Sequence, residues 1–455
     1  MTLGHKIGML IPIIGITFVG VWSGKNVKSE SDFTIAGREA GPLLIAGMIL
    51  GTAIGGSATI GTAQLAYEYG MSGVCFTFGG GLAFISMALF LVKPLYEAEV
   101  QTGPQILITK FGSKAGYLSS LFVSLGTFLS IGANILAAIA LITSVFDISP
   151  LIASVSIGIL VILQIYFGGV WGTGIIGIIR TILLYFAVII SCGIALNIMG
   201  IKGITSQLNF NPVYNIFERG ITNDLAAIFA VIIGYLSTQT YLQAVFMGKD
   251  VKASRRGVII SGLLMFPVGI MGTIVGLYMR SYYPKINSSW AFPTFVIKHL
   301  PPFLSGVILA TLLIVIIATI AGLTLGISTT FSQDIYGKLI NPKATSKKRL
   351  KISRLTIVII IGVGLIFAIT NLKSVIIEWT YFSMTLRGTC MFLPMIMAIF
   401  CKDYIKQKAG ILNIIFAPAL ALIWSIFFPD SIDPLYIGLL TGIIIFSFNI
   451  LNETK

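Results

Sequence analysis

The sequence predicts an all-α polytopic membrane protein of about thirteen transmembrane helices. Two observations carry this prediction. The chain of 455 residues is 56% hydrophobic and only 10% charged, a composition too apolar for the surface of a soluble domain. Apolar runs of roughly 20 residues, the length that crosses about 30 Å of hydrocarbon, also recur from end to end with short polar breaks between them.

Hydropathy places the spans in order along the chain. The first run, 5–23, is short enough for a signal peptide, but it lacks a convincing small-residue cleavage site, so we expect a helix. Long apolar runs of this kind do not alternate as barrel strands do, which favours helices throughout. The further helices are expected at 41–66, 72–94, 117–146, 149–168, 174–199, 223–247, 256–279, 300–331, 354–371, 374–400, 409–428 and 433–451.

Basic residues in the predicted loops set the orientation. With the N-terminus outside and the C-terminus in the cytoplasm, roughly three times as many Lys and Arg residues fall on the inner side as on the outer side. The formal charge of +14 therefore indicates cytoplasmic loops in a multi-pass protein of the cell membrane, with the lipid bilayer and no nucleic acid as a partner. The oligomeric state stays open.

The span 41–66 contains glycines that could interrupt its helix. Gly47, Gly51 and Gly55 allow the backbone to leave the helix near mid-membrane, where freed carbonyls would face a substrate or cation site. Small residues at this spacing also serve close helix packing without any site. Both interpretations remain open at this point.

The span 223–247 is the second unusual one. Its segment 234–243 places Tyr, Ser, Thr and Gln side chains inside an otherwise apolar helix, and such groups need partners or water. The spans 41–66 and 223–247 are five helices apart, so they cross the membrane in opposite directions. Two inverted repeats would have this arrangement, although 41–199 and 223–400 share no clear sequence identity.

Two arginines fall within predicted spans. Arg387 lies near the middle of 374–400, a depth that costs several kcal/mol unless the side chain faces a cavity or a partner. It could be the counter-charge for a carboxylate, since a guanidinium matches carboxylate geometry, or a buried structural or snorkelling side chain. For Arg180, nearer the inner end of 174–199, we expect a carbonyl-capping or interfacial role.

Nothing in the sequence predicts an enzyme. We find no loop long enough for a soluble catalytic domain, and no carboxylate, histidine or metal-ligand cluster near the membrane centre. The four cysteines lie in or beside apolar runs and suggest no disulfide or metal site. The function must therefore reside among the helices, as in a secondary transporter.

Five short motifs then resemble the sodium:solute symporter family in their order and spacing. They read Asp32-Phe-Thr-Ile-Ala-Gly-Arg38, Gly61 with Ala66-Tyr-Glu-Tyr-Gly70, Gly168-Gly-Val170, Gly248-Lys-Asp250 and Ser332-Gln-Asp-Ile-Tyr336. The resemblance implies a LeuT-like fold with a core of two inverted five-helix repeats, alternating access, and symport driven by a cation, with sodium as the coupling ion and no cofactor.

The resemblance also implies a division of the chain. Residues 1–40 would form an extra helix and an inner loop, 41–199 the first repeat and 200–222 an outer loop. Residues 223–400 would form the inverted second repeat, and 401–455 two C-terminal helices.

A sodium site is implied between the interrupted span 41–66 and the span 300–331. The matching positions are Gly51, Ile54, Val315, Ala318 and Thr319. Ala318 stands where the family usually carries a hydroxyl, and Gly177 stands near the place where it often has an acidic residue. Both departures remove oxygen or negative charge, so a proton-coupled or uncoupled carrier, or a solute sensor without flux, is the alternative.

We expect a small polar solute, a class that includes carboxylate-bearing molecules. The candidate substrate-binding residues lie in the interrupted spans, in the neighbouring helix 72–94 and in 374–400. They are Gly55, Ser57, Thr59, Phe76, Gln239, Tyr241 and Arg387.

Overall fold

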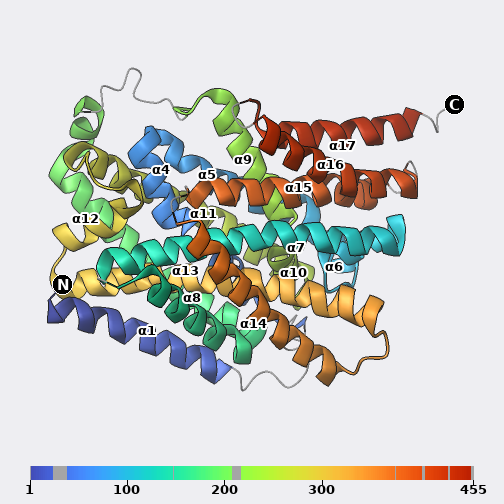
Figure 1. Ribbon diagram of the computed structural model, residues 1–455, viewed down its shortest axis with the longest axis horizontal. Helices are drawn as coiled ribbons and strands as arrows, with labels where there is room; N and C mark the ends of the chain where they lie inside the picture. The colour runs from blue at the N-terminus through green and yellow to red at the C-terminus, as the bar shows by residue number, and fades with distance from the viewer. Residues whose placement is uncertain are drawn as a thin grey trace.

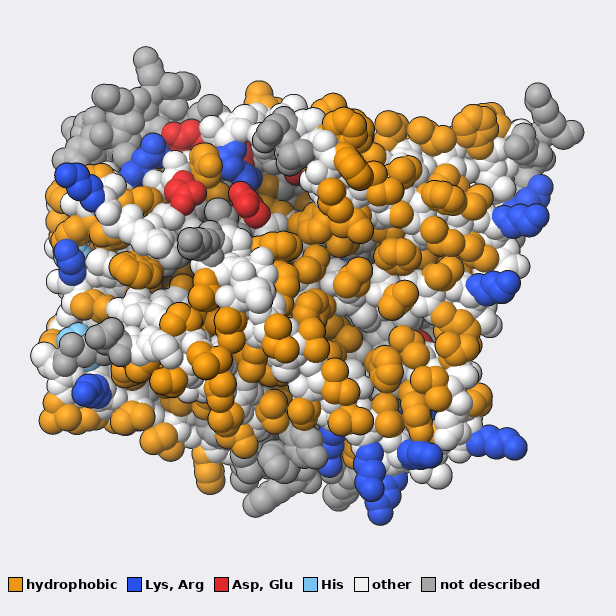
Figure 2. All heavy atoms as spheres, viewed as in Figure 1, with side chains coloured by type: hydrophobic (Ala, Val, Ile, Leu, Met, Phe, Trp, Pro, Cys, Tyr) orange, Lys and Arg blue, Asp and Glu red, His pale blue; other side chains and the backbone are white. Residues whose placement is uncertain are grey.

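The computed structural model describes residues 2–23, 38–146, 148–207, 217–372, 374, 376–401, 405–428 and 431–451. The described part of the chain is almost entirely helical. Four helices run along the long axis of the bundle (Figure 1): α1 (Leu3–Ser23), α7 (Gly103–Val145), α13 (Pro302–Thr330) and α17 (Pro434–Leu451). Hydrophobic side chains cover the middle of the face in Figure 2, and most Lys and Arg side chains lie toward the two ends of that axis. This pattern fits a bundle that crosses a bilayer along its long axis.

The other elements complete the bundle. Longer helices are α8 (Pro150–Gln207), α11 (Val251–Tyr282), α14 (Ser346–Thr370), α15 (Ile376–Phe400) and α16 (Gln407–Phe427). Shorter ones are α3 (Pro42–Ala53), α4 (Thr62–Tyr69), α5 (Cys75–Ser86), α6 (Val92–Glu97), α9 (Ile221–Leu236), α10 (Gln239–Phe246) and α12 (Ala291–His299). Single π or 3₁₀ segments are η3 (Ser57–Gly61), η4 (Gly70–Val74), η5 (Met87–Leu91), η6 (Ser288–Trp290) and η7 (Phe331–Ile340).

The predicted all-α polytopic class is confirmed, but the count of about thirteen spans is not. Among the described residues, 9 helices are long and apolar enough to cross a membrane, or 10 if α9 and α10 count as one span. Three further apolar segments, Leu3–Ile16, Pro42–Ala53 and Pro150–Ile165, are shorter than a span over the described side chains. The first and the third belong to the longer helices α1 and α8, and the second ends at a break in the helix. The family-like motif at 32–38 lies outside the described residues except for Arg38.

Hydropathy did not predict two further features. The helix α7 begins well before the expected residue 117, and Gly112 interrupts it with a φ of 78°, a conformation that favours glycine. The segment before Gly112 is therefore a separate short helix that precedes the span. The short helix α12 follows α11 and lies with α4 at one end of the long axis, opposite α6 (Figure 1). We name the two ends of the bundle the α12 end and the α6 end.

The first interrupted span has the predicted break. The helix α3 ends at Ala53, Ile54 leaves the helical region with φ −90° and ψ 89°, and a π-type turn begins at Ser57. Close packing is present in the same span, because a Cβ on Gly47 would lie 2.5 Å from the carbonyl oxygen of Gly174 in α8. The glycine spacing thus coincides with both a break and close packing, and the binding role of the break stays a prediction.

The second interrupted span is also bent. α9 and α10 meet at an angle of 45° across the break between Leu236 and Gln239. Its polar side chains bind buried carbonyls: the Thr238 hydroxyl donates to the carbonyl of Gly234, beside the break, at 2.5 Å, and the Thr240 hydroxyl to that of Gly322, within the helix α13, at 2.9 Å. In a dry interior such pairing is needed at each freed carbonyl.

The two interrupted spans are joined by their backbones at the α6 end. Ala40, just before α3, forms a parallel bridge with Gly248, just after α10. The amide of Ala40 donates to the carbonyl of Met247, and the amide of Lys249 to that of Ala40, both at 3.0 Å. One span therefore begins where the other ends, which confirms that they cross in opposite directions. The repeat boundaries at 41–199 and 223–400 stay a prediction.

Candidate solute and cation site

The break after α3 faces a small cavity in the centre of the bundle. Its walls come from α5, α7, α9, α10, α13 and α15, and its volume is about 20 Å³, enough for roughly one water molecule. The structure is therefore closed around this space, and a solute would require the walls to move apart.

Six of the residues expected from the sequence line this one cavity. They are Gly55, Ser57, Phe76, Tyr241 and Arg387 of the substrate set and Thr319 of the cation set. Two others lie elsewhere. The Thr59 hydroxyl donates to the carbonyl of Gly55 at 2.8 Å, and the Gln239 amide bridges Gly103 and Gln101 toward the α6 end. The binding roles of all eight residues stay predictions.

Polar side chains from neighbouring helices satisfy the broken backbone. The amide of Gly56 donates to Oδ1 of Asn134 at 3.0 Å, and the Ser57 hydroxyl lies 2.8 Å from that of Thr380. The Tyr235 hydroxyl donates to the carbonyl of Ala53 at 3.2 Å. Asn134 and Thr380 were not among the expected residues; the signal for Asn134 is an amide side chain within a predicted span.

Aromatic rings form one side of the cavity. Tyr235 and Tyr241 lie with ring centroids 4.7 Å apart, and Phe76 meets Tyr235 edge to face at 6.2 Å. Phe84 stacks on Tyr235 from behind at 5.1 Å. Such contacts fix the ring positions, so the aromatic part of the cavity wall is stiff.

Arg387 is buried at this cavity with weak partners. Its side chain is 1% exposed, and its two terminal nitrogens lie 3.4 Å from the hydroxyls of Thr127 and Ser130. Its Nε has no hydrogen-bond partner. Gly126 allows this burial, since a Cβ there would lie 3.0 Å from the carbonyl oxygen of Ser383 in α15. The guanidinium therefore has donors to spare.

No acidic side chain compensates this charge within the described part of the chain. The ion pairs there join Lys93 to Glu97, Arg219 to Asp224 and Lys338 to Asp334. Two hydroxyls near Arg387 are also unsatisfied: Thr52 and Thr319 line the same cavity, and neither Oγ1 has a partner. The cavity is thus positively charged and offers several free polar groups.

Two of the expected cation positions, Gly51 and Val315, lie at the second buried arginine. Arg180, 1% exposed, donates from Nη1 to the carbonyl of Val315 at 2.9 Å and from Nη2 to the carbonyl of Leu50 at 3.5 Å. A Cβ on Gly51 would lie 3.0 Å from that Nη2. Carbonyl contacts were one of the two roles expected for Arg180.

The remaining positions of the cation set differ in their surroundings. Ile54 is buried at the break, with its amide on the carbonyl of Leu50 at 2.9 Å. Ala318 lines a gap beside Gln164 and Ile176 of α8 rather than the central cavity. At Gly177, a Cβ would lie 1.9 Å from the carbonyl oxygen of Gly47, so no side chain fits there.

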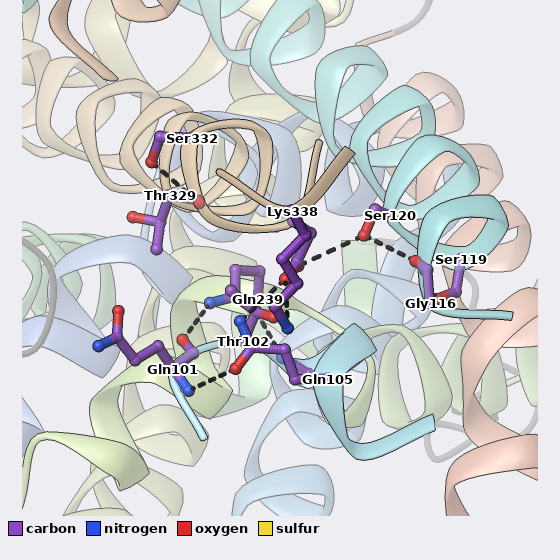
Figure 3. Close-up of polar contacts among 12 residues, drawn as sticks. Gln101, Thr102, Gln105, Gly116, Ser119, Ser120, Gln239, Thr329, Ser332 and Lys338 are labelled. Carbon is purple, nitrogen blue, oxygen red and sulfur yellow. Dashed lines mark hydrogen bonds and ion pairs between the residues drawn. The ribbon is translucent and has the colours of Figure 1, made fainter. Parts of the chain in front are cut away.

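The two ends of the bundle are unlike. At the α12 end, a cavity of about 530 Å³ lies among α4, α7 and η6. The α6 end holds a buried polar cluster, of which Figure 3 labels Thr102, Gln105 and Lys338. The Asp334 carboxylate accepts from Thr102 at 2.7 Å and from Gln105 at 2.8 Å. Lys338 adds an ion pair at 3.7 Å. These contacts join α7 to η7 and hold the α6 end together.

An all-helical membrane fold with two interrupted spans around a closed polar cavity defines a transporter. The chain belongs to the sodium:solute symporter family, whose model matches residues 33–412. An uncharacterised symporter of Bacillus subtilis (strain 168), YwcA, is 23% identical over 385 residues, which cover 79% of this chain and 74% of the relative.

Solved structures share the fold. A substrate-bound, outward-open Na⁺-coupled sialic acid symporter is similar with a TM-score of 0.85 and 16% identity, over 99% of this chain and 97% of that one. The closed nucleobase-cation-symport-1 family transporter MHP1 is similar with a TM-score of 0.61 and 16% identity, over 94% and 96%. These structures confirm the LeuT-like fold, and membership of the symporter family confirms a transporter rather than an enzyme.

Proposed function

We propose that this protein carries a small anionic solute across the cytoplasmic membrane by alternating access, and that Arg387 binds a carboxylate group of that solute. The family supports symport of a solute with a cation. The observation that carries the solute class is the buried guanidinium of Arg387, which has a free Nε and no acidic partner among the described residues.

The cavity favours an anion on energetic grounds. A buried charge is costly unless a partner of opposite sign meets it, and a carboxylate can accept two parallel hydrogen bonds from one guanidinium. The free hydroxyls of Thr52 and Thr319 would serve the rest of a small polar molecule. A cationic solute would face Arg387 without a compensating carboxylate, so it is disfavoured.

The two ends of the bundle suggest how access alternates. We place the α12 end outside, as the basic loops predict, so the cavity of about 530 Å³ there is the outer vestibule. The cluster on Asp334 then closes the inner side. Transport would require the Asp334 contacts to break as the vestibule closes, with solute binding shifting the balance between the two states.

Sodium is the coupling ion that the family name suggests. The surroundings of two expected ligands favour a carrier that does not use sodium. Two expected ligands show little capacity for Na⁺, because the Val315 carbonyl accepts from Arg180 and Ala318 has no side-chain oxygen. A carrier coupled to protons, or an uncoupled one, is therefore the second candidate. A solute sensor without flux would bind the solute in the same way.

Uptake into proteoliposomes tests the proposal. Radiolabelled acetate, lactate and pyruvate are compared with alanine, with glucose and with acetamide, which has the shape of acetate but no charge. We expect a monocarboxylate to be taken up and to raise the melting temperature, and acetamide to do neither. Preference for a sugar or a neutral amide would contradict the anionic solute. Binding without uptake would identify a sensor.

A further inference from the structure

We infer that the Arg180 guanidinium is a built-in cation that takes the place of a transported sodium ion between α3 and α13. The contacts of Arg180 do not involve the solute. Only what the inference implies for the driving force of transport rests on the proposed function. Arg180 belongs to α8 and reaches across to two other helices, bonding the carbonyl of Val315 in α13 at 2.9 Å and that of Leu50 in α3 at 3.5 Å.

These contacts coincide with the positions expected to bind a cation. Val315 is one expected ligand, and Gly51 follows Leu50 and lies against the Arg180 guanidinium, 3.0 Å from an added Cβ. Val315 and Thr319 are one helical turn apart on α13, so they face the same side. The guanidinium therefore occupies the space between the two helices that an ion would share.

The chemistry of the site favours the guanidinium over a sodium ion. A hard cation needs several oxygen ligands, but the Val315 carbonyl is already an acceptor for Arg180 and Ala318 contributes no oxygen. A carboxylate cannot be added from α8 at Gly177, because a Cβ there would lie 1.9 Å from the Gly47 carbonyl oxygen. A sodium ion would also meet the fixed positive charge at contact distance.

An arginine differs from an ion in two ways that matter for transport. It keeps its proton at any physiological pH, and it cannot leave the protein. Its bonds to α3 and α13 hold these helices together as a bound ion would, but no ion enters the cell from this position. Sodium would then supply no driving force here, and opening the inner side would require these bonds to break instead of an ion to dissociate.

The test measures binding of ²²Na⁺ to the purified full chain without any solute, in the wild type, Arg180→Lys and Arg180→Ser. The melting temperature in NaCl and in KCl is the second readout. We expect no saturable ²²Na⁺ binding by the wild type or by Arg180→Lys below about 100 mM, which is about a hundredfold above a millimolar dissociation constant, since both keep the positive charge. Arg180→Ser frees the carbonyls and should gain binding and a higher melting temperature in NaCl than in KCl.

Saturable ²²Na⁺ binding by the wild type would overturn the inference, and so would a folded Arg180→Ser protein that gains none. If Arg180→Ser does not fold, the wild type and Arg180→Lys still decide the matter. The result is separate from the proposed function: a failure to take up carboxylates would leave the sodium measurement unchanged, and sodium binding by the wild type would leave the role of Arg387 unchanged.

Discussion

Arg387→Gln separates a solute-binding arginine from a structural one. Glutamine keeps a polar side chain of similar length but removes the charge. Arg387 is 1% exposed, and the hydrogen bonds of its guanidinium within the described residues, both to hydroxyls, are 3.4 Å long. A carboxylate would thus be its principal partner. Removing one member of a buried charge pair costs about 2–5 kcal/mol, and about 3 kcal/mol corresponds to a roughly 150-fold loss of affinity.

Arg387→Gln should weaken carboxylate binding without destabilising the solute-free protein. Arg387 has no acidic partner in the described structure, so its replacement relieves an uncompensated buried charge instead of breaking an ion pair. We expect Arg387→Gln to melt at the same temperature as the wild type or higher. A structural arginine would instead lower the melting temperature on replacement.

The assay combines equilibrium binding of a radiolabelled monocarboxylate with thermal melting in detergent. Arg256→Gln is the control, because Arg256 is exposed on α11 and does not line the cavity. Its substitution removes the same charge from the surface of the protein. Carboxylate affinity within about fivefold of the wild type in Arg387→Gln, a change of roughly 1 kcal/mol, would refute the reasoning.

Two pairs of substitutions test the packing and the closed end. Gly177→Ala should lower the free energy of unfolding by about 1–3 kcal/mol, because its Cβ would press on the α3 backbone at 1.9 Å. Gly193→Ala in the same helix has open space and should raise it by about 0.5–1 kcal/mol; equal melting temperatures would contradict this account. Asp334→Ala removes a fully buried carboxylate that accepts from Thr102 and Gln105 and pairs with the partly exposed Lys338, and should cost about 1.5–3 kcal/mol, whereas Glu97→Ala, in an exposed pair of the same i,i+4 spacing, should cost under about 0.5 kcal/mol. Thermal melting of all four variants tests these expectations. A drop in melting temperature in Glu97→Ala as large as that in Asp334→Ala would refute the interpretation that the Asp334 cluster holds the α6 end closed.

Local signals explain what the sequence could predict. The breaks at 54–56 and 237–238 follow from glycines and from clustered hydrogen-bonding side chains, which act within a few residues of their positions. The depth of Arg387 is equally local, since it follows from the apolar residues around it. These features need no knowledge of which helices are neighbours.

Features that depend on neighbouring helices could not be predicted in this way. Arg180 was expected to meet carbonyls, but its partners are Leu50 and Val315, separated from it by 130 and 135 residues in sequence. Asn134 binds the broken backbone only because α7 packs against the segment that begins η3. Gln239 belongs to the predicted polar cluster, yet its amide turns toward the α6 end. Which face of a helix meets which neighbour is decided by packing across the whole bundle.

The backbone bridge between Ala40 and Gly248 has an implication for how such a protein can diversify. Main-chain amides and carbonyls make this link, so it does not depend on which side chains stand nearby. The lining of the central cavity can therefore change by mutation, and with it the cargo, while the two interrupted spans remain tied at one end. The backbone link and the residues that select the solute lie in different parts of the chain. The selecting residues can therefore change in evolution while the link is conserved.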